Sequence, residues 1–239
     1  MPVEFHISPR KVAITLTIVA LFLALVSYAI EAYEWSLGVN NTYWVKQASD
    51  LFNVTYEANI PTWYNASLFL FAALFASLIA TDQIQKQDRW RIHWVGLTLL
   101  LLYLSIDDAS AIHEMFTVPI RAFLGTSGYL YFAWLLVGIP FAIVMGLLFL
   151  PFVLALPTKT RWIFIAAGLL YLSGAVGVEA INSNTFELNG GIVTPQYTAA
   201  SGVEEFLEMF GIIVLIYGLQ TYIQAYLGAI SIHFSRDLR

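Results

Sequence analysis

The chain has 239 residues, of which 59% are hydrophobic and only 11% are charged. Soluble domains carry about a quarter charged residues, so this composition, with a mean hydropathy of +0.73, excludes an ordinary soluble domain and indicates an integral membrane protein. The absence of cysteine excludes disulfides, thiolate nucleophiles and cysteine-ligated metals. The net charge of −5 matters less than where the charges lie. No phosphate-binding loop, dinucleotide glycine motif or basic patch points to a nucleotide or nucleic-acid partner.

Six apolar stretches are long enough to cross a hydrocarbon core of about 30 Å, which takes about 20 helical residues. They predict one polytopic membrane domain, residues 1–239, folded as an all-α bundle of six transmembrane helices. The spans are expected near residues 11–33, 62–83, 93–116, 129–156, 161–182 and 202–227. The first stretch resembles a signal peptide but lacks a small-residue cleavage pattern, so we interpret it as a retained span.

Basic residues are distributed unequally between the two sides of these spans. Nine flank one side and only Lys46 and Arg121 lie on the other. By the positive-inside rule, this asymmetry predicts a multi-pass protein of the cell membrane (plasma or inner) with both termini in the cytoplasm. The nine are Arg10, Lys11, Lys86, Arg89, Arg91, Lys159, Arg161, Arg236 and Arg239.

The first outer loop, residues 34–61, contains a second helical pattern. Its apolar residues recur at helical spacing over residues 44–52, with charged residues on the opposite side. Such a pattern predicts a short amphipathic helix lying in the membrane interface. Pro61 stands in a helix-start position and opens the second span.

Carboxylates inside the predicted spans are the most informative feature of the chain. One charge in hydrocarbon costs roughly 2.5–3.5 kcal/mol on insertion scales. In the predicted orientation, the acidic groups of several spans meet in one layer in the outer half of the membrane. They need protons, a partner cation or a bound metal to neutralise them. The groups are Asp107, Asp108, His113, Glu114, Glu179, Glu204, Glu205 and Glu208.

The third and sixth spans supply most of this layer. Residues seven apart differ by about 20° around a helix, so Asp107 and Glu114 are predicted to share one helix face. In the sixth span, Ser201 followed by Glu204 has the pattern of a capping box, which predicts that the helix begins there. Glu208 lies one turn deeper and has no such structural role.

Carboxylates from several helices together with a histidine are typical of metal sites in helical bundles. We therefore interpret Asp107, His113, Glu114, Glu179 and Glu208 as ligands of a divalent metal. Iron, manganese or zinc fits this donor set, with calcium or magnesium as alternatives. The remaining groups, Asp108, Glu204 and Glu205, would support the ligands or carry protons. The Glu-x-x-His spacing of ferritin-like proteins is absent.

These residues favour a metal-dependent membrane enzyme, a hydrolase or an oxidoreductase, acting on a lipid-like or apolar small substrate. A cation- or proton-coupled transporter that uses the same carboxylates is the first alternative, although the inner half of the spans offers few polar groups beyond Gln220 and Gln224. A further alternative is an accessory subunit of a larger membrane complex or of a homo-oligomer. The acidic groups could also act only as polar contacts between helices.

Three segments carry a resemblance to a known family. They are residues 57–64 (Glu-Ala-Asn-Ile-Pro-Thr-Trp-Tyr), Asp107-Asp108 followed by His113-Glu114, and Glu204-Glu205-x-x-Glu208. Together they resemble a family of small prokaryotic multi-spanning membrane proteins that carry no established function. The resemblance implies no activity. The chain lacks the three-histidine pattern of ceramidase-like hydrolases and a lysine suited to a retinal Schiff base.

Overall fold

The computed structural model describes residues 8–38 and 43–227. Within these ranges the chain folds into helices joined by short turns, with no strand. The α-helices are α1 (Pro9–Leu37), α2 (Tyr43–Phe52), α3 (Ile60–Gln85), α4 (Arg91–Ser110), α5 (Thr117–Leu124), α6 (Leu135–Ala155), α7 (Thr158–Leu172), α8 (Glu179–Leu188) and α9 (Pro195–Tyr226). Two short 3-10 helices, η2 (Glu114–Phe116) and η3 (Gly128–Leu130), flank α5, and a π-helical segment, η4 (Ser173–Val178), joins α7 to α8.

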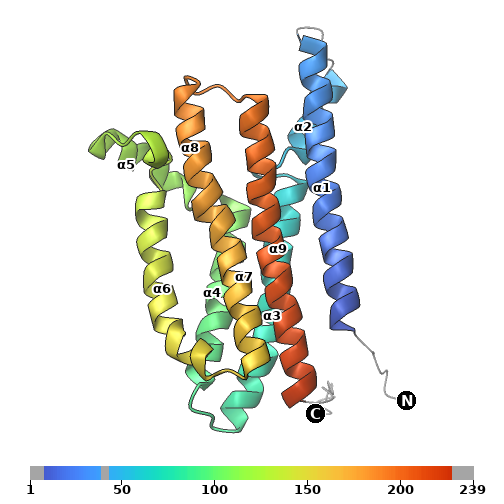
Figure 1. Ribbon diagram of the computed structural model, residues 1–239, viewed down its shortest axis with the longest axis vertical. Helices are drawn as coiled ribbons and strands as arrows, with labels where there is room; N and C mark the ends of the chain where they lie inside the picture. The colour runs from blue at the N-terminus through green and yellow to red at the C-terminus, as the bar shows by residue number, and fades with distance from the viewer. Residues whose placement is uncertain (1–7, 39–42, 228–239) are drawn as a thin grey trace, which may run out of the picture.

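Six helices are long and apolar enough to cross a membrane, which confirms the predicted number. They are α1, α3, α4, α6, the continuous α7–α8 unit and α9. The long helices run side by side (Figure 1), and α1 begins at the end of the bundle where α9 finishes. We name the opposite end, where α4 ends at Ser110 and α9 begins at Pro195, the acidic end. The short helix expected in the first loop is α2.

The core forms where α3, α4, α7 and α9 meet. Helix α3 presents small buried residues, among them Ala72, Ala73 and Ala76, which let neighbouring helices approach closely. Helix α9 supplies larger buried side chains to the same core, such as Ile213 and Ile216. The core therefore fixes α3, α4, α7 and α9 against one another, while α6 contributes one buried side chain to it, Phe152.

Helix α6 stands at the edge of the bundle (Figure 1). Only Leu135 and Phe152 of its residues are buried. The Phe152 ring packs on Trp94 of α4, with ring centroids 5.0 Å apart, at the end of the bundle opposite the acidic end. Between its two buried residues, side chains of α6 such as Phe141 and Met145 line a space between α6 and the core helices.

The structure corrects four predicted helix boundaries. Helix α6 begins at Leu135, not near residue 129, and the α7–α8 unit continues to Leu188, beyond the predicted end near residue 182. Helix α4 ends at Ser110, not near residue 116, because Ala111 has a left-handed backbone (φ 52°) that stops the helix. The expected shared helix face of Asp107 and Glu114 is therefore wrong. Helix α9 begins at Pro195, where the Thr194 hydroxyl accepts a hydrogen bond from a first-turn amide. The predicted capping box at Ser201 is also wrong, since that residue lies within the helix.

Helix α5 was not predicted. It projects sideways from the acidic end (Figure 1), and several of its apolar side chains are exposed, with Phe123 87% exposed. Helix α2 also displays large exposed apolar residues, including Trp44. Two short helices with exposed apolar faces therefore lie near the acidic end, as expected for segments that rest in a membrane interface.

Close approach of α7 and α9 depends on Gly211. A Cβ atom there would lie 2.7 Å from the backbone nitrogen of Tyr171 and 2.9 Å from the carbonyl oxygen of Ala167. Gly211→Ala should therefore force the two helices apart and lower the free energy of unfolding by about 1–3 kcal/mol. Gly202→Ala on the same helix is the matched control, since a Cβ there meets nothing within 4 Å. Thermal unfolding in detergent measures both, and equal melting temperatures would contradict the prediction.

Candidate metal centre and the cavity around it

The turn after α4 positions His113. Once Ala111 has ended the helix, the chain turns back so that both oxygens of Asp107 reach His113. The backbone N–H of His113 donates to Oδ1 of Asp107 at 3.0 Å, and Nδ1 of the imidazole lies 3.0 Å from Oδ2. A carboxylate on Nδ1 orients the ring and leaves Nε2 available to a ligand. Asp107 therefore holds the imidazole from behind.

Glu57 approaches from the loop between α2 and α3. Asn59 stabilises this loop, because its amide nitrogen donates to the backbone oxygen of Tyr56 at 2.7 Å and its side-chain oxygen caps α3 by accepting from Thr62 at 3.1 Å. Glu57 belongs to this loop, and its Oε1 atom lies 3.9 Å from Nε2 of His113. The ring nitrogen that Asp107 leaves free thus faces a carboxylate from a different part of the chain.

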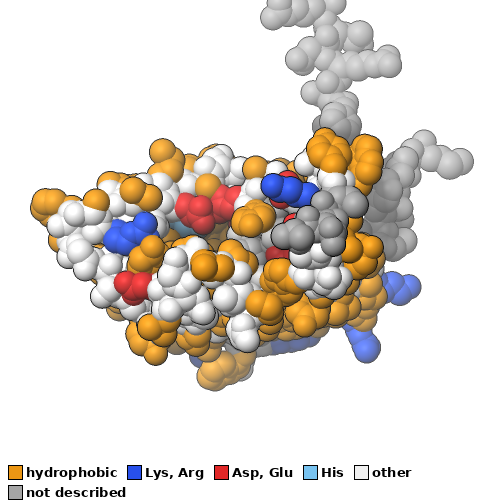
Figure 2. Space-filling view, turned by 90° about the horizontal axis from the view of Figure 1, so that it is seen from above, with side chains coloured by type: hydrophobic (Ala, Val, Ile, Leu, Met, Phe, Trp, Pro, Cys, Tyr) orange, Lys and Arg blue, Asp and Glu red, His pale blue; other side chains and the backbone are white. Residues whose placement is uncertain are grey.

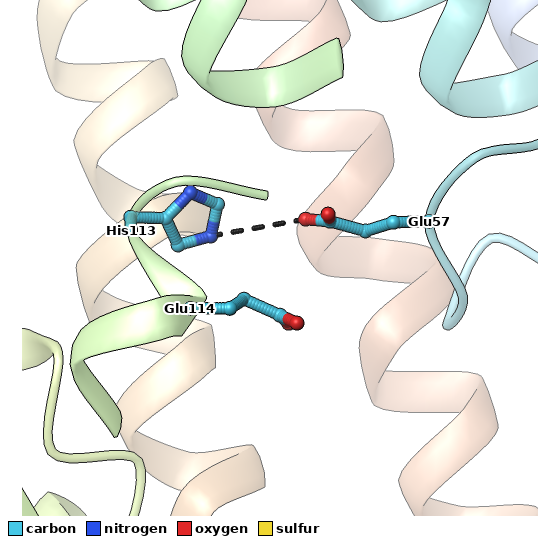
Figure 3. Close-up of side chains that lie close together, drawn as sticks. All are labelled: Glu57, His113 and Glu114. Atoms are coloured by element: carbon cyan, nitrogen blue, oxygen red, sulfur yellow. Dashed lines mark ion pairs between the residues drawn. The ribbon is translucent and has the colours of Figure 1, made fainter. Parts of the chain in front are cut away.

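Glu57, His113 and Glu114 form the metal triad. Each offers one ligand atom, and these atoms all lie within 4.8 Å of one another. The three side chains point toward one another from the loop before α3 and from the turn and 3-10 helix after α4 (Figure 3). Donor atoms around a tetrahedral zinc ion, with bonds of about 2.0–2.1 Å, lie roughly 3.3 Å apart. Small side-chain rotations would bring the triad to that spacing.

Neighbouring charges raise the pKa of two members of the triad, Glu57 and His113. Burial, then the charge of Glu114, raises the pKa of Glu57 to about 7. Burial alone lowers the pKa of His113, but the hydrogen bond and charge of Asp107 outweigh this, and its pKa is raised above 6.5. A divalent ion would therefore compete with protons for these groups near neutral pH.

Two of the remaining acidic residues, Asp108 and Glu179, accept hydrogen bonds from side chains elsewhere in the chain. Asp108 accepts a hydrogen bond from the Asn65 amide at 2.9 Å, and its second oxygen is buried without a partner among the described residues. Glu179 accepts one from Nε1 of Trp134 at 2.8 Å. The Trp134 ring also packs on the His113 imidazole, with centroids 4.7 Å apart. The triad and the deeper carboxylates are thus connected through shared neighbours.

All of these groups line one cavity of about 730 Å³, a volume typical of small-molecule sites. Arg121 is the only arginine or lysine that lines it. Viewed from above, acidic side chains gather near the middle of this end of the molecule (Figure 2). Its eight carboxylates are Glu57, Asp107, Asp108, Glu114, Glu179, Glu204, Glu205 and Glu208.

An irregular segment brings α9 close to this cavity. Gly174 lies in the π-helical η4, and a Cβ atom there would be 2.7 Å from the Glu204 carbonyl oxygen and 3.0 Å from Cγ of Glu208. Only glycine permits this approach. Single π-helical turns inside longer helices are frequent at functional sites, and here the irregular turn packs on the two glutamates.

The predicted site residues lie together, but in different surroundings. All eight line the cavity, and His113 and Glu114 belong to the triad. Asp107 contacts His113, whereas Glu179 and Glu208 do not join a converging group within the described ranges. The third member of the triad, Glu57, was not predicted as a ligand. One sequence feature could have identified Glu57: it lies just before Asn59 and Pro61, where a candidate membrane-spanning helix begins at the acidic end.

The chain belongs to a family that is defined by a domain of unknown function (DUF8692), whose model matches residues 13–222. This confirms the resemblance to a family without an established activity. No curated protein matches the chain. No solved structure matches it either. The function must therefore be inferred from the site itself.

Asp107→Asn tests whether Asp107 supports the metal triad. The amide keeps the shape of the side chain but loses the negative charge that orients His113. Loss of such a supporting carboxylate typically weakens metal affinity 10–100-fold. We expect that weakening for zinc or manganese measured by competition with a chelating dye. Asp50→Asn, on the exposed surface of α2, should bind metal like the wild type, and equal affinities in all three proteins would contradict the assignment.

Metal affinity should also depend on pH. The pKa of Glu57 is about 7 and that of His113 is raised above 6.5, so both groups hold protons in the metal-free protein below neutral pH. Affinity should fall as pH is lowered through 7, by up to about 100-fold per pH unit if two protons are displaced. Calorimetry in buffers of different ionisation enthalpy measures the protons released. Binding that is independent of pH between about 5.5 and 8 would argue against these ligands.

Proposed function

We propose that this protein is a multi-pass membrane protein with one divalent metal ion at its acidic end, and that it hydrolyses an ester or amide bond of a lipid-like substrate. The observation that carries the proposal is the metal triad: an imidazole oriented by Asp107 and two carboxylates, at the mouth of a largely apolar cavity. Both termini would lie in the cytoplasm and the acidic end would face outward, as the distribution of basic residues predicts.

The donor set favours a single catalytic ion. Only one group of at least three converging ligands occurs among residues 8–38 and 43–227, whereas a di-iron or di-manganese centre needs ligands around two ions. Zinc, iron or manganese fits an imidazole with two carboxylates better than calcium or magnesium does. Three protein ligands leave a position open for water, as in catalytic zinc sites.

The chemistry would follow from this open position. A bound divalent ion makes a water molecule acidic enough to lose a proton near neutral pH. Asp108, whose second oxygen has no partner among the described residues, would accept that proton. The oxygen of water would replace the alcohol or amine on the substrate carbonyl carbon, and Asp108 would return its proton to that leaving group.

A transporter fits the cavity less well. A cation that crosses the bilayer needs polar groups along its whole path. Beyond the carboxylates, however, the cavity is lined by apolar side chains such as Leu97, Phe149 and Phe152. That wall suits an alkyl chain and opposes the passage of an ion.

The direct test is metal content together with esterase activity in detergent-purified protein. We expect about one equivalent of zinc, iron or manganese in the wild type, and hydrolysis of p-nitrophenyl laurate that chelation abolishes and added metal restores. Glu57→Gln and His113→Ala should lose both metal and activity, because each removes one of three ligands.

Asp50→Asn is the control for both readouts, and circular dichroism verifies that the variants remain folded. Wild-type protein that is well folded but binds no divalent metal would refute the proposal. Full metal content in both ligand variants would refute the triad.

A further inference from the structure

Glu205 and Glu208 remain without a counter-charge once the metal centre is filled. Both carboxyl groups line the cavity, and neither forms a hydrogen bond or ion pair with another residue of the described chain. A divalent ion and Arg121 together offset three of the eight carboxylate charges around the cavity. An additional cation would therefore stabilise the site.

The arrangement of these two residues favours an organic cation over a second metal ion. Unlike Glu57, His113 and Glu114, they belong to no group of three converging ligand atoms within the described residues, so a second metal ion would have too few protein ligands here. Tyr171 lines the same cavity as Glu205 and Glu208. Carboxylates combined with an aromatic ring are the groups that recognise ammonium head groups.

The cavity becomes apolar beyond Glu208. Its wall continues along α9 with Ile212 and Leu215 and along α6 with Met145. On α4, the stretch from Asp108 to Leu97 spans roughly 16 Å at 1.5 Å per residue. The far end is closed by the rings of Phe152 and Phe164, which pack on Trp94 with centroid distances of 5.0 and 6.2 Å. The cavity thus combines a charged part with a narrow apolar extension.

The cavity also reaches the lateral surface of the bundle between α4 and α6. Tyr103 of α4 and Phe141 of α6 line the cavity, yet they are 44% and 37% exposed. Their rings, 6.0 Å apart, bridge the two helices. Val118 of α5 lines the same region and is exposed as well. In a membrane, this opening would face lipid near the level of the head groups.

We propose that the cavity binds a single-chain amphiphile with an amine head group, whose ammonium lies between Glu205 and Glu208 and whose alkyl chain fills the apolar extension toward Trp94. The molecule would come in from the bilayer between α4 and α6. This inference assigns a substrate class to the proposed hydrolysis. It depends on the proposed function only for the reaction that would follow binding. Binding itself requires no metal.

The test measures quenching of tryptophan fluorescence by ω-bromododecylamine in metal-free protein held in lipid nanodiscs. The bromine at the chain end should reach Trp94, so Trp94→Phe should remove most of the quenching. ω-Bromododecanol and ω-bromododecanoate are matched probes with the same chain. We expect the amine to bind at least about tenfold more tightly than the alcohol, as a buried charge-assisted contact provides.

Two sets of variants distinguish the contribution of the head group to binding affinity from that of the alkyl chain. Glu205→Gln combined with Glu208→Gln should bring amine affinity close to that of the alcohol while leaving alcohol binding unchanged. Gly168→Leu should weaken both probes, because Gly168 lines the cavity and a side chain there enters open space. Gly177→Leu is its control, since that position is also open but lies outside the cavity lining.

Equal affinities of amine and alcohol in the wild type, or tightest binding of the carboxylate, would overturn the inference. So would an amine preference that survives the double substitution. Because the measurement is made without metal, these results are independent of the metal centre. Conversely, a protein that fails to bind metal but shows the amine preference would refute the proposed hydrolysis alone.

Discussion

The rest of the structure depends on the placement of eight carboxylates around one cavity inside an apolar helical bundle. Such groups are costly in a membrane unless cations, protons or hydrogen bonds compensate them. Asn65, Trp134 and Asn182 each donate to one of them. These contacts and Arg121 are fewer than the eight carboxylates, so protons or a bound cation must neutralise the rest.

The irregular parts of the fold occur where this charge is concentrated. Helix α4 stops at Ala111, which lets Asp107 orient His113, and η4 interrupts the α7–α8 unit where Gly174 meets Glu204 and Glu208. The opposite half of the bundle is regular and apolar, with aromatic packing around Trp94. The left-handed Ala111 and the π-helical η4 thus lie beside the acidic groups, whereas the opposite end has, among the described residues, one left-handed non-glycine residue, Gln87 (φ 54°), in the turn between α3 and α4.

Composition and hydropathy were sufficient to predict six apolar helices and one acidic layer, because both follow from the length and polarity of single segments. Contacts across a turn were not predictable in this way. Nothing in the local pattern showed that Ala111 would adopt a left-handed backbone, and without that turn His113 could not be placed against Asp107. Glu57 was missed for a related reason: it lies in a loop, and only the fold brings it to His113. The early start of α9 was hidden by the polar residues 195–201, which hydropathy assigns to a loop.

The most direct test of the central claim is X-ray diffraction at the zinc absorption edge from crystals grown with zinc. We expect one strong anomalous peak about 2.0–2.2 Å from Nε2 of His113 and from one oxygen each of Glu57 and Glu114. A peak bound instead by Glu179, Glu204, Glu205 or Glu208, or no peak in the cavity, would contradict it.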